Sequence, residues 1–129
     1  MLKKTKTNEV QTFIGPNCVV EGKIQDLSSI QVDGKVTGDI NTEGDVYVGK
    51  YGFIQGNVQG KNVYVYGKID GNVTAEERVE LYESSRVEGD LKTTRLIVHE
   101  GAFFRGTSYM EDVQVASSVE KIFRGDGER

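Results

Sequence analysis

Apolar residues recur along this chain in pairs spaced two residues apart, and the pairs themselves return at a nearly constant interval. The recurring pairs are Ile30 and Val32, Val46 and Val48, Val63 and Val65, Val79 and Leu81, Leu96 and Val98, and Val113 and Val115. Successive side chains of a strand point to opposite faces, so both members of a pair lie on one face. Each pair therefore predicts a short strand with one buried face.

A five-residue unit with apolar ends and a central glycine returns with nearly the same period. It reads VEGKI (20–24), VTGDI (36–40), IQGNV (54–58), IDGNV (69–73), VEGDL (87–91) and, in degenerate form, FRGTS (104–108). Its glycines are Gly22, Gly38, Gly56, Gly71, Gly89 and Gly106, and the interval between them varies slightly from one unit to the next. Both neighbours of every one of these glycines are polar, which is typical of a strand with one face in water. The glycine is either an inward position that leaves room for aliphatic side chains or a bend that needs unusual dihedral angles.

This period predicts an all-β fold, a parallel β-helix of about six to seven coils, because one coil cannot bury its apolar face unless others stack on it. The varying interval favours the right-handed form, since left-handed hexapeptide solenoids keep a strict six-residue rhythm. We expect a flexible N-terminal tail over 1–11 with possible membrane targeting, the β-helix over 12–123, and short disordered C-terminal residues over 124–129.

The composition of the chain argues against several classes of function. Sixteen glycines against one proline and no tryptophan suit short strands and tight turns. A net charge of −4 argues against coating nucleic acid, whose phosphates are bound largely by lysine and arginine. The single cysteine, Cys18, excludes a disulfide framework within the chain or a Cys-rich zinc site and suits a reducing compartment. Without an apolar stretch of membrane-spanning length or a secretory signal, we expect a cytoplasmic protein with no cofactor and no metal.

The repeated units, the IQVDGKVTGDI run at 30–40 and the EGAFFRG segment at 100–106 resemble those of the bactofilins, bacterial cytoskeletal proteins. The resemblance covers roughly residues 12–115. It implies a right-handed parallel β-helix that polymerises without nucleotide, through contacts between the β-helix ends, into nonpolar filaments. It also implies a peripheral position at the inner face of the cytoplasmic membrane, and a role in cell shape or in localising cell-wall and morphogenetic proteins.

Two sets of residues carry these expectations. The final coils are bulky, and we predict a polymerisation interface there; the resemblance singles out Phe104. The interface residues are Phe103, Phe104, Val113, Val115 and Phe123. The alternative is that these side chains only close the core internally. The start of the chain, Met1, Leu2, Lys3 and Lys4, resembles the family's membrane-targeting motif, with Leu2 where phenylalanine is frequent. The alternative is a solvated tail.

Residue types that carry catalysis are sparse. His99 is the only histidine, and it follows an inward valine, so we expect it on the surface. No nucleophile with a nearby base emerges, and the acidic residues at 76–83 lack the spacing of a calcium loop. Outward tyrosines, Tyr47 with Tyr64 and Tyr66 with Tyr82, are expected to stack as ladders or to form lateral contacts. We therefore predict a scaffold and not an enzyme; the alternatives are a β-solenoid binding module that does not polymerise and an oligomer similar to solenoid acyltransferases.

Overall fold

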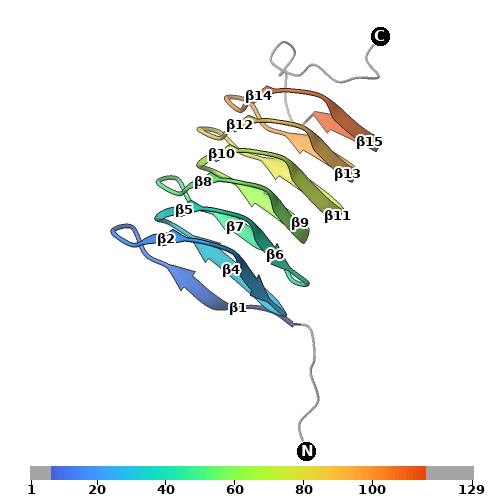
Figure 1. The fold of residues 1–129 in the computed structure, drawn as a ribbon. Coiled ribbons are helices and arrows are strands. Elements are labelled where there is room, and N and C mark those ends of the chain that lie inside the picture. Colours follow the sequence, from blue (N-terminus) through green and yellow to red (C-terminus); the bar gives the residue numbers. More distant parts are fainter. Residues whose placement is uncertain (1–6, 116–129) are drawn as a thin grey trace, which may run out of the picture.

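The structure, a computed structural model, describes the backbone of residues 7–115 and the side chains of 9–109. Over these residues the chain forms strands β1 to β15 and no helix. Figure 1 shows the strands stacked in successive coils, with β1 and β15 at opposite ends of the stack. The predicted all-β solenoid is confirmed. Its handedness remains a prediction.

Two parallel sheets run along the stack, and every strand pairs with strands of neighbouring coils. The smaller sheet contains β2 (Val19–Glu21), β5 (Lys35–Thr37), β8 (Phe53–Gln55), β10 (Lys68–Asp70), β12 (Arg86–Glu88) and β14 (Phe103–Arg105), one strand for each of six coils. The larger sheet contains β1 (Thr7–Ile14), β3 (Ile24–Asp26), β4 (Ser28–Val32), β6 (Ile40–Thr42), β7 (Val46–Val48), β9 (Val58–Val65), β11 (Val73–Leu81), β13 (Leu91–Val98) and β15 (Ser108–Val115).

The predicted apolar columns form the core between the two sheets. In the smaller sheet, Ile69 pairs in register with Ile54 on one side and Val87 on the other, and all three are 0% exposed. The paired positions of β4, β7, β9, β11 and β13 are buried in the same way. Matching positions in each coil thus align aliphatic side chains into continuous columns, and burying each one stabilises the fold by roughly 1.5–3 kcal/mol.

The recurring glycines lie at the corner where the chain leaves the smaller sheet for the larger one. All six have positive φ, from 126° at Gly22 to 156° at Gly71. A Cβ placed on Gly38, for example, would collide with the carbonyl oxygen of Gly22 in the coil beneath, and Gly89 would meet Gly71 in the same way. The glycine is therefore a bend required by backbone contact between coils, and the inward-spacer interpretation is wrong.

The polar residues after Gly38, Gly56 and Gly71 form a ladder of hydrogen bonds along the stack. The Asp39 carboxylate accepts the backbone N–H of Asn57 at 2.9 Å. The side-chain oxygen of Asn57 accepts the N–H of Asn72 at 3.1 Å, and that of Asn72 accepts the N–H of Asp90 at 2.9 Å. Each side chain holds the next corner at a fixed height, so these polar residues do more than face water.

The first strand begins at Thr7, inside the segment expected to be a tail, and β15 ends at Val115. The predicted domain limits at 12 and 123 therefore remain predictions. Inward residues Val20 and Ile24 of the first coil are only partly buried, whereas their equivalents one coil further, Val36 and Ile40, are 0% and 1% exposed. The difference arises because no described coil lies beneath the first one.

Candidate functional site: the two ends and the aromatic ladders

The N-terminal end of the solenoid is an open sheet edge. Strands β1 and β2 are the outermost strands of the two sheets there, and within residues 7–115 no further strand pairs with them. Their outer N–H and C=O groups face the end of the stack together with the partly buried side chains of Val20 and Ile24. Such an edge can extend its sheet with a strand of another chain.

Three of the most exposed large apolar residues belong to this first coil. Val10, Phe13 and Val19 are 40%, 59% and 61% exposed. Sequence reasoning concentrated on the opposite end and missed them. A signal was present at Val19, because it aligns with Lys35 in an outward column that otherwise carries lysine, arginine or phenylalanine. An aliphatic residue at an outward position indicates a surface that another molecule can cover.

Asp26 ties the first strand to the next coil. Its carboxylate accepts a hydrogen bond from the Thr12 hydroxyl, and its Oδ1 accepts the Ser28 backbone N–H at 3.1 Å. The Thr12 hydrogen bond holds the pKa of the Asp26 carboxyl below its usual value. Burial acts in the opposite direction, and the backbone N–H groups of Ser28 and Leu27 add to the lowering. The ionised carboxylate is thus part of what holds the edge strand in place.

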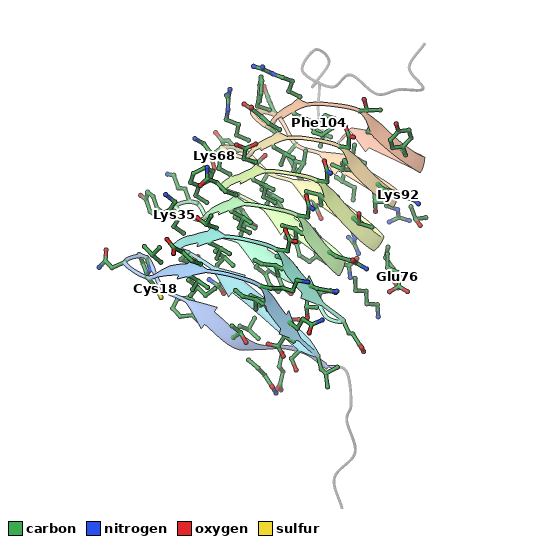
Figure 2. All side chains as sticks on the ribbon, in the orientation of Figure 1. Cys18, Lys35, Lys68, Glu76, Lys92 and Phe104 are labelled. Carbon is green, nitrogen blue, oxygen red and sulfur yellow. The ribbon has the colours of Figure 1, made fainter. Side chains whose placement is uncertain are left out.

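The C-terminal end presents β14 and β15 as its outermost described strands, and two of the predicted interface residues lie on β14. Phe104 is 4% exposed and aligns with Val87, so its ring closes the apolar column of the last coil. Figure 2 shows it at the opposite end of the stack from Cys18. Phe103 lies on the outer face, where Arg86 and Arg105 approach its ring centre to 4.2 Å and 5.8 Å. The two adjacent phenylalanines therefore have different surroundings.

Of the other predicted site residues, the structure gives backbone positions for two and does not describe the rest. Val113 and Val115 lie on β15 in register with Leu96 and Val98, which places them in the two inward columns. Phe123 and the proposed targeting residues fall outside the described part of the chain. The targeting residues are Met1, Leu2, Lys3 and Lys4. The assembly and membrane roles of all these residues remain predictions.

Stacked aromatic rings run up the outer face of the larger sheet, as the sequence predicted. Tyr47 and Tyr64 stack with ring centres 5.1 Å apart, and Tyr66 and Tyr82 stack at 4.2 Å with their planes 4° apart. His99 extends the second stack, 4.7 Å from Tyr82. We call Tyr66, Tyr82 and His99 the long ladder.

His99 is less exposed than the sequence suggested. Its side chain is 33% exposed, and Nε2 lies 2.7 Å from a carboxylate oxygen of Glu80, which is itself 13% exposed. Burial and the nearby Glu80 carboxylate strongly raise the pKa of Tyr82. The histidine therefore ends a stack and bonds a half-buried carboxylate.

The described residues contain neither a candidate metal centre nor a membrane-spanning helix. Among the described residues, no group of three or more histidine, cysteine, aspartate or glutamate side chains is placed to hold a metal ion. The same part of the chain contains no helix with the length and apolar character needed to cross a membrane. The two open ends and the aromatic ladders remain the surfaces of interest.

Comparison with known proteins identifies the family of this chain. The family model for bactofilins, described as polymer-forming cytoskeletal proteins, matches residues 12–109. The chain is 31% identical over 109 residues to bactofilin BacO of Myxococcus xanthus (strain DK1622), covering 84% of this chain and 86% of BacO. It is 34% identical over 108 residues to bactofilin BacP of the same organism, covering 84% of this chain and 45% of BacP. No solved structure gave a significant match. The chain belongs to the bactofilin family of polymer-forming cytoskeletal proteins.

Proposed function

We propose that this bactofilin polymerises without nucleotide, by end-to-end contact of its solenoids, into nonpolar filaments. The observation that carries the proposal is the pair of open parallel-sheet edges, β1 with β2 at one end and β14 with β15 at the other. A docked copy would continue the sheets at the usual strand spacing of about 4.8 Å and would cover apolar side chains that have no neighbouring coil on one side within residues 7–115. Burial at such a joint supplies the driving force, so nucleotide hydrolysis is not required.

The absence of polarity follows if like ends meet. A joint between two N-terminal ends, or between two C-terminal ends, has two-fold symmetry and uses one surface twice. Alternating joints of these two kinds give a filament whose two directions are equivalent. The partly buried inward residues of the first coil, Val20 and Ile24, support an N-terminal joint. The core column that ends at Phe104 supports a C-terminal one.

We further propose that the filament lies at the inner face of the cytoplasmic membrane and positions cell-wall or morphogenetic proteins. The support is in the sequence, where Met1 and Leu2 precede Lys3 and Lys4. Each lysine near an anionic leaflet contributes on the order of 1 kcal/mol, so one copy binds weakly. A filament presents many copies, and avidity makes the attachment stable. Sedimentation with anionic vesicles tests this: replacing Lys3 and Lys4 together by glutamate should release filaments that still assemble.

Cys18 allows a direct test of the N-terminal joint. It is exposed, lies near that end, and is the chain's only cysteine (Figure 2). In filaments with joined N-terminal ends, two copies of Cys18 flank one joint, so a bis-maleimide that spans the joint should give covalent dimers and nothing larger. In head-to-tail filaments each Cys18 is separated from the next by the length of a solenoid, so linkers shorter than that length give no dimers. Dimers from pelleted filaments would therefore support the nonpolar arrangement, and their absence with every linker up to the length of a solenoid would contradict it; Cys18→Ser is the control.

The C-terminal joint is tested by placing a charge in its last apolar column. Phe104→Arg should prevent pelleting and filament formation in negative-stain microscopy while the circular dichroism spectrum stays that of a β-sheet protein. Val87→Arg is the matched control, because Val87 occupies the same column one coil inside and is 0% exposed. If both variants unfold alike, Phe104 closes the core internally and is not an interface residue. Wild type that stays a small oligomer at all concentrations would refute polymerisation itself.

A further inference from the structure

The long ladder ends in a gap. Leu81 pairs with Val98 and with Val65, and Val48 pairs with Val65 and with Val32. The residues that follow these paired positions therefore stand in one outward column along the solenoid. In order they are Asp33, Gly49, Tyr66, Tyr82 and His99. Rings fill the last three positions, but Gly49 has no side chain, so the stack stops at Tyr66.

The Asp33 carboxylate faces this gap from the coil beneath. A Cβ built on Gly49 would collide with Asp33 Oδ1, which shows that the carboxylate leans over the glycine. Its side-chain hydrogen bonds come from Gln31 Nε2 and are long, at 3.3 and 3.4 Å. Among the described residues no lysine, arginine or histidine forms an ion pair with Asp33. We call the space between the Asp33 carboxylate and the Tyr66 ring the notch.

Among the described residues, Tyr66 differs from several other outward aromatic rings in having no cation over its ring. Phe53 has two lysine ammonium groups within 6.0 Å of its ring centre, Phe103 has two guanidinium groups, and Tyr64 has that of Arg78 at 5.9 Å. Tyr66 is 41% exposed, and its recorded ring contact is the stack with Tyr82 on one face. No cation of the described residues lies over Tyr66. The chain thus supplies a cation to some outward rings and leaves open the ring beside Asp33, a carboxylate that has no ion pair among the described residues.

We propose that the notch receives the guanidinium group of an arginine carried by an extended segment of another protein. The Asp33 carboxylate reaches the level of Gly49, one coil or about 4.8 Å beneath Tyr66, so a flat group stacked under the Tyr66 ring would lie beside the carboxylate. A guanidinium can stack on the Tyr66 ring and donate two hydrogen bonds to the Asp33 carboxylate at the same time. A lysine ammonium, which is more strongly hydrated and not planar, suits this arrangement less well.

The groove beside the long ladder sets the direction of the segment. Its cavity, about 930 Å³, is lined by the three ladder rings and by residues of the adjoining turns, including Lys50, Glu83 and Glu100. Glu83 follows Tyr82, and Glu100 follows His99, so carboxylates flank the far end of the groove. Lys50 stands near the notch with its ammonium 5.9 Å from the ring centre of Tyr51. A second cation of the bound segment is therefore favoured near His99 and disfavoured near Gly49.

The distance from the notch at Gly49 to the far end of the groove at His99 predicts how far apart the two basic residues of the bound segment lie in its sequence. From Gly49 to His99 the column rises three coils, about 14 Å at the usual strand spacing. An extended chain advances roughly 3.3 Å per residue, so about four residues span the groove. The favoured segment thus carries an arginine for the notch and a second basic residue four positions away. This proposal does not depend on polymerisation.

Equilibrium dialysis of the full chain against a dansyl-labelled Arg-Gly-Gly-Gly-Arg peptide tests the notch in any assembly state. Wild type should bind this peptide at least fivefold more tightly than the matched peptides with lysine or citrulline at both basic positions. Asp33→Asn and Tyr66→Leu should each weaken arginine-peptide binding at least fivefold, whereas Lys50→Gln should tighten it. The controls are Asp70→Asn, an exposed carboxylate on β10, and Tyr51→Leu, a tyrosine outside the ladder. Thermal melts must show that each variant remains folded.

Several outcomes would overturn the proposal. Equal binding of arginine and lysine peptides, with Asp33→Asn and Asp70→Asn weakened alike, would mean attraction to net negative charge only. Loss of binding in Tyr51→Leu but not in Tyr66→Leu would move the site away from the ladder. No measurable binding by wild type at millimolar protein and low salt would exclude a guanidinium site.

Discussion

At the scale of single residues, a corner glycine such as Gly89 meets two requirements at once, a positive φ and close contact with the backbone of the coil beneath. Other glycines of the chain have only the first requirement or neither. Gly89 has φ of 142°, and a Cβ there would strike the Gly71 carbonyl. Gly22 has φ of 126° but nothing within 4 Å of a Cβ, because no coil of the described residues lies beneath it. Gly15 lacks the positive φ, and a Cβ there would meet Phe13 at an ordinary 3.6 Å.

Alanine substitutions at these three positions should therefore form a graded series. Gly15→Ala should change the free energy of unfolding by less than about 0.5 kcal/mol. Gly22→Ala should lower it by about 1–2 kcal/mol through backbone strain alone. Gly89→Ala should lower it by about 3 kcal/mol or more, because the coils must also move apart. Chemical denaturation measures all three. Equal losses at Gly22 and Gly89 would show that contact between coils adds nothing to the need for glycine.

At the scale of one strand, β1 is an edge strand with an irregular register. It pairs on one side only, with β4, and its register is interrupted between Thr7 and Val10 and between Val10 and Thr12. The Thr12 hydroxyl bond to Asp26 adds an anchor next to these irregularities. An edge strand that pairs on one side needs such side-chain bonds to stay ordered, and an ordered edge is what a docking copy would recognise.

The Asp26 anchor makes the first coil sensitive to acid. The pKa of Asp26 in the folded chain lies below its ordinary value of 3.8, so the ionised carboxylate stabilises the folded state. This stabilisation is complete above the unfolded pKa and is lost as the pH falls through the folded pKa. Asp26→Asn and Thr12→Val should lower the melting temperature at pH 7. Below about pH 4, the melting temperature of these variants should fall less steeply with pH than that of wild type. Thr12→Ser, which keeps the hydroxyl, should retain the wild-type decline. An unchanged acid profile in Asp26→Asn would assign the acid sensitivity to other carboxylates.

At the scale of the whole molecule, stability comes from contacts between neighbouring coils. Each inner coil, such as the one carrying β8, is covered on both sides by parallel strands, whereas the coils carrying β2 and β14 are covered on one side within the described residues. In a solenoid the stability is nearly a sum of terms for each coil and each interface between coils. A joint between two molecules would add one more interface of the same kind, so assembly and folding should reinforce each other.

The melting temperature should consequently depend on protein concentration. If end-to-end joints form only between folded chains, each tenfold rise in concentration above the assembly threshold adds up to about 1.4 kcal/mol of stability. For a chain of this size that corresponds to an increase of about 3–5 °C. Differential scanning calorimetry over a hundredfold range of concentration would show it. A melting temperature that stays constant across this range while filaments are visible would mean that joints contribute little to folding stability.

The chain's repeat was enough to predict the coil, the inward columns and the outward polar positions. The physical reason is that a strand alternates its side chains locally, and repetition in one coil after another multiplies that local signal. Pairs such as Val63 and Val65 are buried as predicted, and Tyr66 and Tyr82 stack as predicted. The bactofilin resemblance rested on the same repeated units, and the family comparison confirms it.

Only the tertiary structure decided features that depend on what lies one coil above or below. Because the coils differ in length, it took the register to show that His99 bonds Glu80 and that Gly49 leaves a gap beneath Tyr66. The glycine corners could not be distinguished from inward spacers until a carbonyl was seen at each Cβ position that has a coil beneath it. The partial exposure of Val20 and Ile24 likewise follows from having no described coil beneath them. Sequence periodicity determined how each coil folds, and stacking determined which surfaces remain open.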